Sequence, residues 1–243
     1  MEVIKLKETD STNRVAKELA SQGAPEWTVV CAKTQTDGRG RMGRTFFSPE
    51  GNLYMSVILR PKFRAENALL ITTAAAAAVY DAVEELFCEK PHIKWVNDLY
   101  LRNRKICGIL AEAIFLENTL DCVILGIGVN VSKPKGEIPT DIKNIYGYIC
   151  ETADEKAADK LCISIVEKFK VYYNNLESKP HLEKYRARLG LCGKDITVLQ
   201  GENKKSATAL GIDDDFRLIV KYNDGTEDAL VFGEVSIKGN FYD

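Results

Sequence analysis

The pattern of apolar residues changes near residue 190, and this change predicts how the chain is organised. Before it, short runs rich in β-branched residues alternate with longer segments of helical periodicity. After it, short apolar runs follow one another with turn signals between them. We therefore expect an α+β domain over residues 1–188, built on a mixed β-sheet flanked by helices, and a small β-barrel over residues 189–243. A chain of 243 residues is long enough to bury both cores.

The expected helices cover residues 13–21, 65–87, 156–175 and 181–189. Asp10 or Ser11 is the expected N-cap of the first helix, and the alanine run Ala74–Ala78 gives the second a high helix propensity. The expected strands of the first part cover residues 3–6, 27–32, 53–59, 93–95, 99–101, 105–115 and 120–131, the last broken near Gly126 and Gly128. Those of the second part cover residues 196–199, 207–212, 217–222, 229–232 and 234–238.

Composition narrows the class of protein. The formal net charge is −2, so bulk charge gives no reason to expect a nucleic-acid partner. No apolar run is long enough to span a membrane, and the first residues lack the apolar core of a secretory signal. Seven cysteines without a C-x-x-C pair are typical of reduced thiols in a cytoplasmic protein, and two histidines argue against a histidine-based zinc site.

A loop rich in arginine and glycine is the most informative segment. Three glycines and three arginines fall within Gly38–Arg44, just after Gln35. Glycine permits close backbone approach, and the arginine fork binds carboxylates and phosphates, so the pattern predicts a loop that wraps an anionic ligand. We expect this loop to be mobile without ligand and to close over a bound one, because ordering about ten residues costs on the order of 10 kcal/mol.

Two other interpretations of this loop are open. Gly38–Gly43 also matches the G-x-G-x-x-G dinucleotide fingerprint, but the fingerprint should open a helix and be followed by an acidic residue about 20 positions later, and neither is expected here. A basic loop that is simply solvated, or that grips nucleic acid, is the other interpretation.

Two further segments carry charged and polar residues that could take part in a functional site. Lys94-Trp95-Val96-Asn97-Asp98 ends one expected strand, and Lys105-Ile106-Cys107-Gly108-Ile109-Leu110 begins another, after a hairpin turn at 102–104. Taken alone, Lys105 reads as an exposed hairpin lysine and Asn97-Asp98 as a turn. Their combination with the arginine–glycine loop favours a functional site.

These motifs, with Ser11-Thr12-Asn13 and Gly126-Ile127-Gly128-Val129-Asn130, resemble those of biotin–protein ligases in order and spacing. The resemblance extends over essentially the whole chain. It implies a mixed sheet related to class II aminoacyl-tRNA synthetases, followed by a small SH3-like β-barrel. It also implies an enzyme that uses ATP and Mg²⁺ to form biotinyl-5′-AMP and then transfers biotin to a lysine of a biotin carboxyl carrier protein, such as that of acetyl-CoA carboxylase.

The resemblance implies roles for individual residues. It implies that biotin is bound by a set of polar residues together with residues of the arginine–glycine loop and of the strand that begins at Lys105. These residues are Ser11, Thr12, Asn13, Gln35, Gly38, Arg39, Arg41, Lys105 and Gly108. The residues that it implies for ATP binding are Arg41, Arg44, Phe46, Asn97, Lys105, Asn130, Glu234 and Lys238. Arg41 and Lys105 are expected to neutralise the acyl-phosphate, and Asp98 to orient the acceptor lysine or a magnesium ion; no metal ligand set is assigned.

Three residues depart from the usual pattern of these ligases. Val96 stands where proline is common, Met42 where a further arginine is common, and Phe46 where tryptophan is common. These departures bear on loop rigidity and nucleotide stacking and leave the charged atoms intact. No Ser/His/Asp or Cys/His set is present to form a covalent enzyme intermediate, and none is needed.

The ligase pattern begins at residue 3, so we expect a monofunctional form without the N-terminal DNA-binding domain of some relatives, and no DNA or membrane partner. The resemblance is compatible with a monomer or a homodimer. A lipoate or octanoate transferase shares a related fold but lacks this arginine–glycine loop together with K-W-x-N-D. It is the alternative enzyme, and a non-catalytic nucleic-acid-binding module is the alternative outside enzymes.

Overall fold

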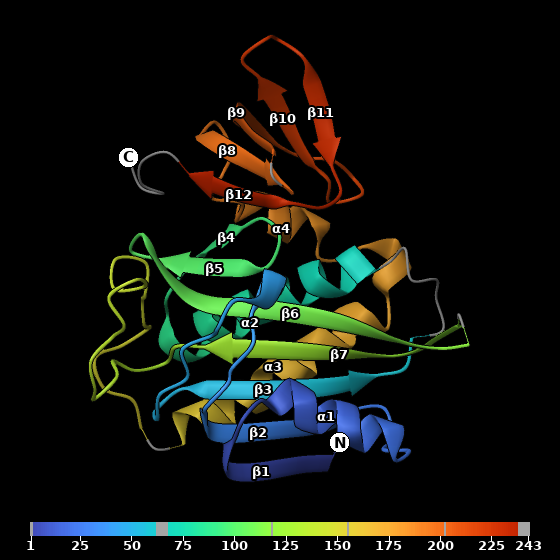
Figure 1. Ribbon diagram of the computed structural model, residues 1–243, viewed down its shortest axis with the longest axis vertical. Coiled ribbons are helices and arrows are strands. Elements are labelled where there is room, and N and C mark those ends of the chain that lie inside the picture. The colour runs from blue at the N-terminus through green and yellow to red at the C-terminus, as the bar shows by residue number, and fades with distance from the viewer. Residues whose placement is uncertain (1, 62–67, 118, 155, 202, 238–243) are drawn as a thin grey trace.

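The computed structural model describes residues 2–61, 68–117, 119–154, 156–201 and 203–237. A seven-stranded mixed sheet forms its centre (Figure 1). The strands are β1 (Glu2–Thr9), β2 (Thr28–Gln35), β3 (Leu53–Leu59), β4 (His92–Lys94), β5 (Asp98–Leu101), β6 (Arg104–Leu116) and β7 (Thr119–Val129). They lie in the order β1-β2-β3-β7-β6-β5-β4, with β1 and β2 parallel and every other pair antiparallel.

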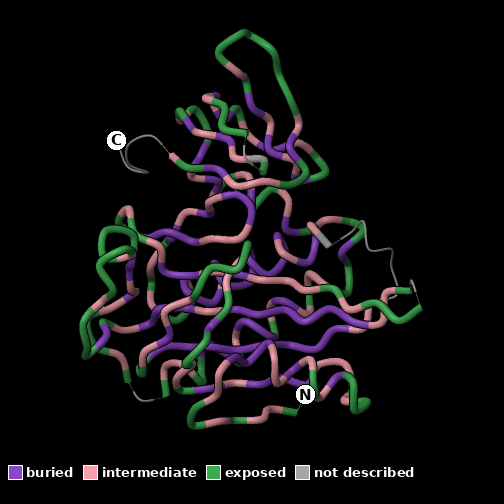
Figure 2. The backbone as a smooth tube through the Cα atoms, in the orientation of Figure 1, coloured by how far each residue is buried: buried purple, intermediate pink, exposed green. Residues whose placement is uncertain are grey.

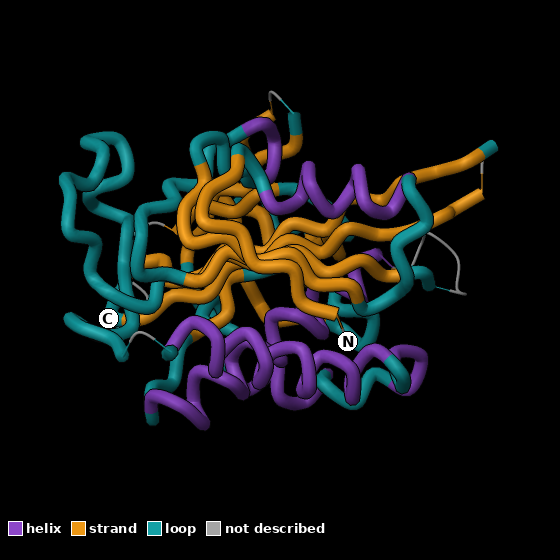
Figure 3. Tube along the Cα trace, turned by 90° about the horizontal axis from the view of Figure 1, so that it is seen from below, coloured by secondary structure: helices purple, strands orange, loops and turns teal. Residues whose placement is uncertain are grey.

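Helices cover both faces of the sheet. Helix α1 (Thr12–Ser21) packs on one face against β2, β3 and β7, while α2 (Ala68–Phe87) and α3 (Ala157–Tyr173) pack together on the other (Figures 1 and 3). The run Ala74–Ala78 is fully buried, because small side chains let α2 lie close to the sheet. Burial is concentrated in the central strands and the helices behind them (Figure 2).

A second sheet follows the short helix α4 (Leu182–Ala187). It is antiparallel and five-stranded, in the order β11-β10-β9-β8-β12. Its strands are β8 (Asp195–Gln200), β9 (Asn203–Ile212), β10 (Leu218–Tyr222), β11 (Glu227–Leu230) and β12 (Glu234–Ile237). We call this unit the C-terminal sheet; it stacks on the end of the first sheet near β4 and α4 (Figure 1).

The expected α+β fold with an all-β C-terminal unit is confirmed, and two expectations about strands were wrong. Strand β7 runs unbroken through Gly126 and Gly128, because β3 and β6 pair with it on both sides and outweigh the entropic cost of glycine. The strand expected at 229–232 ends at Leu230. The chain must turn there to cross from β11 to β12 at the opposite edge, which leaves Phe232 70% exposed.

No helix within the described ranges is both long and apolar enough to cross a membrane. The expected helix at 65–87 is found from Ala68 onward, and its first three residues lie outside the described part.

Candidate functional site

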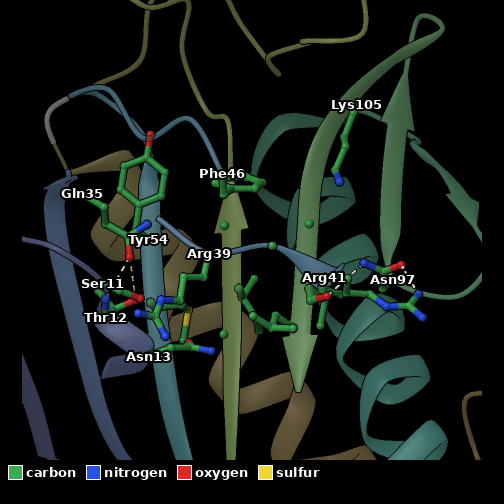
Figure 4. Close-up of a pocket in the computed structure, with 18 residues that line it drawn as sticks. Ser11, Thr12, Asn13, Gln35, Arg39, Arg41, Phe46, Tyr54, Asn97 and Lys105 are labelled. Carbon is green, nitrogen blue, oxygen red and sulfur yellow. Dashed lines mark hydrogen bonds between the residues drawn. The ribbon is translucent and has the colours of Figure 1, made fainter. Parts of the chain in front are cut away.

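Two adjoining cavities lie on the α1 face of the first sheet. The smaller has a volume of about 50 Å³, and the larger, about 340 Å³, opens towards the C-terminal sheet. Five residues line both: Gly40, Arg41, Phe46, Asn97 and Lys105. Figure 4 shows the two groups of polar side chains on either side of Phe46.

The small cavity is lined by a polar set at the start of α1. Ser11 occupies the N-cap position, but its side chain makes no capping hydrogen bond. The backbone N–H and the hydroxyl of Thr12 donate to Gln35 Oε1 at 2.9 and 3.1 Å, and Gln35 Nε2 donates to Ser48 Oγ at 2.9 Å. These bonds fix the orientation of the Gln35 amide, so the cavity presents a defined pattern of donors and acceptors.

Asn13 is held by a second layer of polar groups. Its Oδ1 lies 2.5 Å from Ser56 Oγ, and its Nδ2 donates to Glu112 Oε2 at 2.6 Å. Lys17 pairs with the other oxygen of Glu112 at 2.6 Å. Burial raises the pKa of Glu112, but the hydrogen bonds from Lys17 and Asn13 outweigh it and the net pKa is lowered. Glu112 therefore stays ionised and keeps Asn13 Oδ1 directed at Ser56 Oγ.

The arginine–glycine loop forms a small hairpin over the cavities. Phe46 N donates to Gly38 O, and Gly40 N to Arg44 O, both at 2.7 Å. A side chain at Gly38 would overlap Phe46 O and lie 2.6 Å from Ser48 Oγ, so glycine is required there. The loop leads through a single 3₁₀ turn and back to β3, not into an α-helix. The dinucleotide-fingerprint interpretation is therefore wrong.

The three arginines of the loop point to different partners. Arg41 Nη1 donates to Asn97 Oδ1 at 3.0 Å, and its Nη2 to Gly233 O at 3.3 Å. Arg44 pairs with Glu234 of the C-terminal sheet. Arg39 lines the small cavity and its charge helps to lower the pKa of Glu112. The loop thus joins the first sheet to the C-terminal sheet.

Lysine and aspartate meet across the β5–β6 hairpin. Lys105 Nζ lies 2.8 Å from Asp98 Oδ1, held by charge because this contact does not have the angles of a hydrogen bond. Both side chains are mostly buried, 27% and 15% exposed. Lys94 lies on the same side of the large cavity, where burial lowers its pKa. Two lysines, one of them paired with Asp98, therefore line the large cavity.

Phe46 separates the cavities by packing on the glycines of the sheet. A Cβ on Gly128 would lie 2.5 Å from its ring, and one on Gly108 would lie 2.9 Å from it. Gly108 was assigned to biotin binding; in this structure its closest neighbour is the Phe46 ring.

The structure brings the expected site residues together. Of those within the described ranges, all but Gly38 line one of the two cavities, and Gly38 supports the loop behind them. Asn130 is buried, donating to Gly147 O at 2.9 Å, with an Oδ1 that has no hydrogen-bond partner. Lys238 lies outside the described residues. The roles assigned to all of these residues remain predictions.

Several lining residues were not predicted from the sequence. Tyr54 and Met55 line the small cavity; Phe47, Tyr100, Ile142, Ile145 and Tyr146 line the large one. They carry no local motif, and their positions depend on strand register and on the 131–150 segment folding back along β6. The only signal was that Tyr54 and Met55 fall in the strand expected at 53–59; in the structure β3 pairs with β2, which ends at Gln35.

Two family models of protein ligases match the chain. Residues 5–130 match the model of the Biotin/lipoate A/B protein ligase family, and residues 191–238 match that of the Biotin protein ligase C terminal domain. The chain therefore belongs to the biotin/lipoate A/B protein ligase family.

Relatives of known name agree with this membership. The chain is 34% identical to the Bifunctional ligase/repressor BirA of Bacillus subtilis, with 88% of this chain and 68% of the relative covered. It is 31% identical to the Biotin--[acetyl-CoA-carboxylase] ligase of Paracoccus denitrificans, with 89% and 92% covered. Among solved structures, the biotin protein ligase from Aquifex aeolicus in complex with biotin and ATP has a TM-score of 0.79 at 29% identity, with 98% of each chain covered.

Proposed function

We propose that this chain is a biotin–protein ligase. It activates biotin with ATP to biotinyl-5′-AMP, releasing pyrophosphate, and transfers biotin to a lysine of an acceptor protein, releasing AMP. The observation that carries the proposal is that two cavities of different character meet at two cations, Arg41 and Lys105. A carboxylate entering from one side and a nucleotide from the other would meet there.

The small cavity is proposed to hold biotin. Ser11, Thr12, Asn13 and Gln35 offer fixed donors and acceptors to its ureido ring, and Ile109, Leu110 and Ile127 give the apolar walls. The volume of this cavity, about 50 Å³, is smaller than the ~300 Å³ usual for a ligand pocket. Binding therefore requires Arg39, Phe46 or the loop that carries them to shift, which supports a loop that changes conformation with ligand.

The large cavity is proposed to hold ATP. Arg44, Asn97, Asn130 and Glu234 line it, and the ring of Phe46 is placed between nucleotide and biotin. Magnesium would arrive with the phosphates, where it offsets charge on their oxygens. Among the described residues no cluster of His, Cys, Asp or Glu could hold a metal by itself. Asp98, which pairs with Lys105, is proposed either to orient the acceptor lysine or to bind the magnesium ion.

In the first step a biotin carboxylate oxygen forms a bond to the α-phosphorus of ATP as the bond to the β-phosphate oxygen breaks. Negative charge grows on the non-bridging oxygens, and Arg41 and Lys105 are placed to neutralise it. Their present partners, Asn97 and Asp98, hold the two cations in place until the ligand oxygens replace them.

In the second step the neutral ε-amine of the acceptor lysine attacks the acyl carbon, the bond from that carbon to the AMP oxygen breaks, and the amine gives up a proton. Asp98 is proposed to orient the incoming amine. A closed loop keeps water away from the adenylate between the steps.

The acceptor is proposed to be the biotin carboxyl carrier domain of a carboxylase. The match of residues 191–238 to a biotin ligase domain favours biotin over lipoate. Free thiols at all seven cysteines support a reducing, cytoplasmic location. We expect no DNA or membrane partner, and a monomer or a homodimer.

The test is incubation with biotin, ATP and Mg²⁺, followed by mass spectrometry for biotinyl-5′-AMP and by a pyrophosphate assay. Wild-type protein is expected to form the adenylate, and Lys105→Ala to form almost none. Adenylate formation with lipoate but not biotin would favour the alternative enzyme, and pyrophosphate release by Lys105→Ala at the wild-type rate would remove the role given to Lys105.

A further inference from the structure

One ring of the C-terminal sheet is inserted into the first domain. Phe216, in the turn between β9 and β10, is fully buried and has a positive φ of 58°. It stacks on His181 with ring centroids 4.6 Å apart and meets the edge of Tyr185 at 5.5 Å. A bulky residue keeps this uncommon backbone conformation only when its surroundings impose it. The ring therefore anchors the sheet.

The backbone of the same residue contacts the K-W-V-N-D segment. Trp95 Nε1 donates to Phe216 O at 2.8 Å, in a hydrogen bond that is buried and joins residues 121 positions apart. Trp95 itself is 3% exposed. The next residue is held as well, because Tyr185 Oη donates to Val96 O at 3.2 Å. Two polar contacts thus fix this segment from behind.

The residue that follows faces the reaction site. Asn97 Nδ2 donates to Ile109 O at 3.0 Å, and its Oδ1 accepts from Arg41 Nη1 at 3.0 Å. Arg41 also donates to Gly233 O. The C-terminal sheet therefore holds the segment at Phe216 and the arginine at Gly233, and a shift at either point would move Asn97 relative to Arg41.

We propose that Trp95 is a positioning residue: through its hydrogen bond to Phe216 O, the C-terminal sheet sets the placement of Asn97 and Arg41 for adenylate formation. This inference rests on the proposed function. Small misplacements of reacting groups lower rates strongly, about a hundredfold for 1 Å. The polar set at Ser11, Thr12 and Gln35 is not connected through Trp95, so biotin binding is not expected to change.

The chain offers a matched pair of variants, because Trp27 is its only other tryptophan. Trp27 packs against Phe169 and Tyr173, away from both cavities. Trp95→Phe removes the buried donor and keeps an aromatic ring, and Trp27→Phe makes the same chemical change elsewhere. Phe216→Leu loosens the anchor and leaves the indole in place.

The experiment measures pyrophosphate release, biotin binding by calorimetry and thermal unfolding for all three variants. Trp95→Phe and Phe216→Leu are expected to lower kcat about tenfold or more while biotin affinity stays within about twofold of wild type. Trp27→Phe is expected to keep the wild-type kcat. In the Trp27→Phe background, Trp95 is the sole tryptophan, and adding Phe216→Leu should shift its emission to longer wavelength.

Equal kcat for Trp95→Phe and Trp27→Phe would overturn the inference, as would a parallel loss of rate and biotin affinity. If Trp95→Phe does not fold, Phe216→Leu decides by the same criteria. Absence of pyrophosphate release from wild-type protein would instead count against the proposed function, so the two failures are distinguishable.

Discussion

His181 gives the sharpest prediction about stability. Its ring is fully buried between Phe216 and Tyr172, Nε2 lies 3.0 Å from Thr73 Oγ1, and Nδ1 has no hydrogen-bond partner. Burial lowers the pKa of His181 from 6.5 to about 4. The folded protein therefore holds this ring neutral at a pH where the unfolded chain would protonate it.

The size of the effect follows from linkage. The pKa of His181 is lower in the folded state than in the unfolded state, so the unfolded chain binds a proton first as the pH falls. The neutral His181 therefore contributes fully to the free energy of unfolding above pH 6.5, and this contribution is lost as the pH falls towards 4. The difference between the two pKa values of His181 corresponds to roughly 3 kcal/mol in the free energy of unfolding. About 2 kcal/mol of this is lost between pH 7.5 and pH 5.

The perturbation is His181→Phe, which keeps a ring to stack on Phe216 and removes the titrating group. Thr73 remains satisfied because its hydroxyl also donates to Leu70 O at 3.2 Å. The assay is urea unfolding of wild type and variant at pH 7.5 and pH 5. Other titrating groups are common to both proteins, so the variant is expected to lose about 2 kcal/mol less than wild type. Equal losses would refute a buried neutral His181.

Three other perturbations test the site. Gly128→Ala places a methyl group against the Phe46 ring and is expected to raise the KM for ATP and lower kcat, measured by pyrophosphate release; unchanged kinetics would show that Phe46 does not divide the cavities. Glu112→Ala removes the acceptor of Asn13 Nδ2. We expect calorimetry to show biotin binding weakened about tenfold and ATP binding unchanged. Wild-type affinity for biotin would show that Asn13 does not need the hydrogen bond to Glu112. Limited proteolysis of residues 36–44 is expected to slow when biotin and ATP are added, and equal cleavage would contradict loop closure.

Much of the fold was accessible from local pattern. The long alanine-rich helix, the amphipathic α3 and the close-spaced strands after residue 190 follow from periodicity and turn residues, which act locally. The unbroken course of β7 was not accessible, because the pairing of Gly126 and Gly128 with strands on both sides is a long-range property that local glycine content contradicts.

The site was predictable where it carries motifs and not where it depends on packing. The arginine–glycine loop stands out by residue type and spacing, whereas Lys105 was singled out only in combination with that loop and through the family resemblance. The joint between Trp95 and Phe216 could not be predicted, because an indole donor and a turn carbonyl 121 residues away have no shared signature in the sequence. Nor could the Lys105–Asp98 pair be foreseen from spacing alone, since it depends on the register of the β5–β6 hairpin.

The central claim is that Arg41 and Lys105 together neutralise an acyl-phosphate formed where the two cavities meet. A crystal structure of the wild-type protein with biotinyl-5′-AMP tests it most directly. We predict that Arg41 and Lys105 both lie within hydrogen-bonding distance of the oxygens of the acyl-phosphate, with their contacts to Asn97 and Asp98 lengthened or replaced. An acyl-phosphate bound elsewhere, with both cations still paired as they are here, would contradict the account.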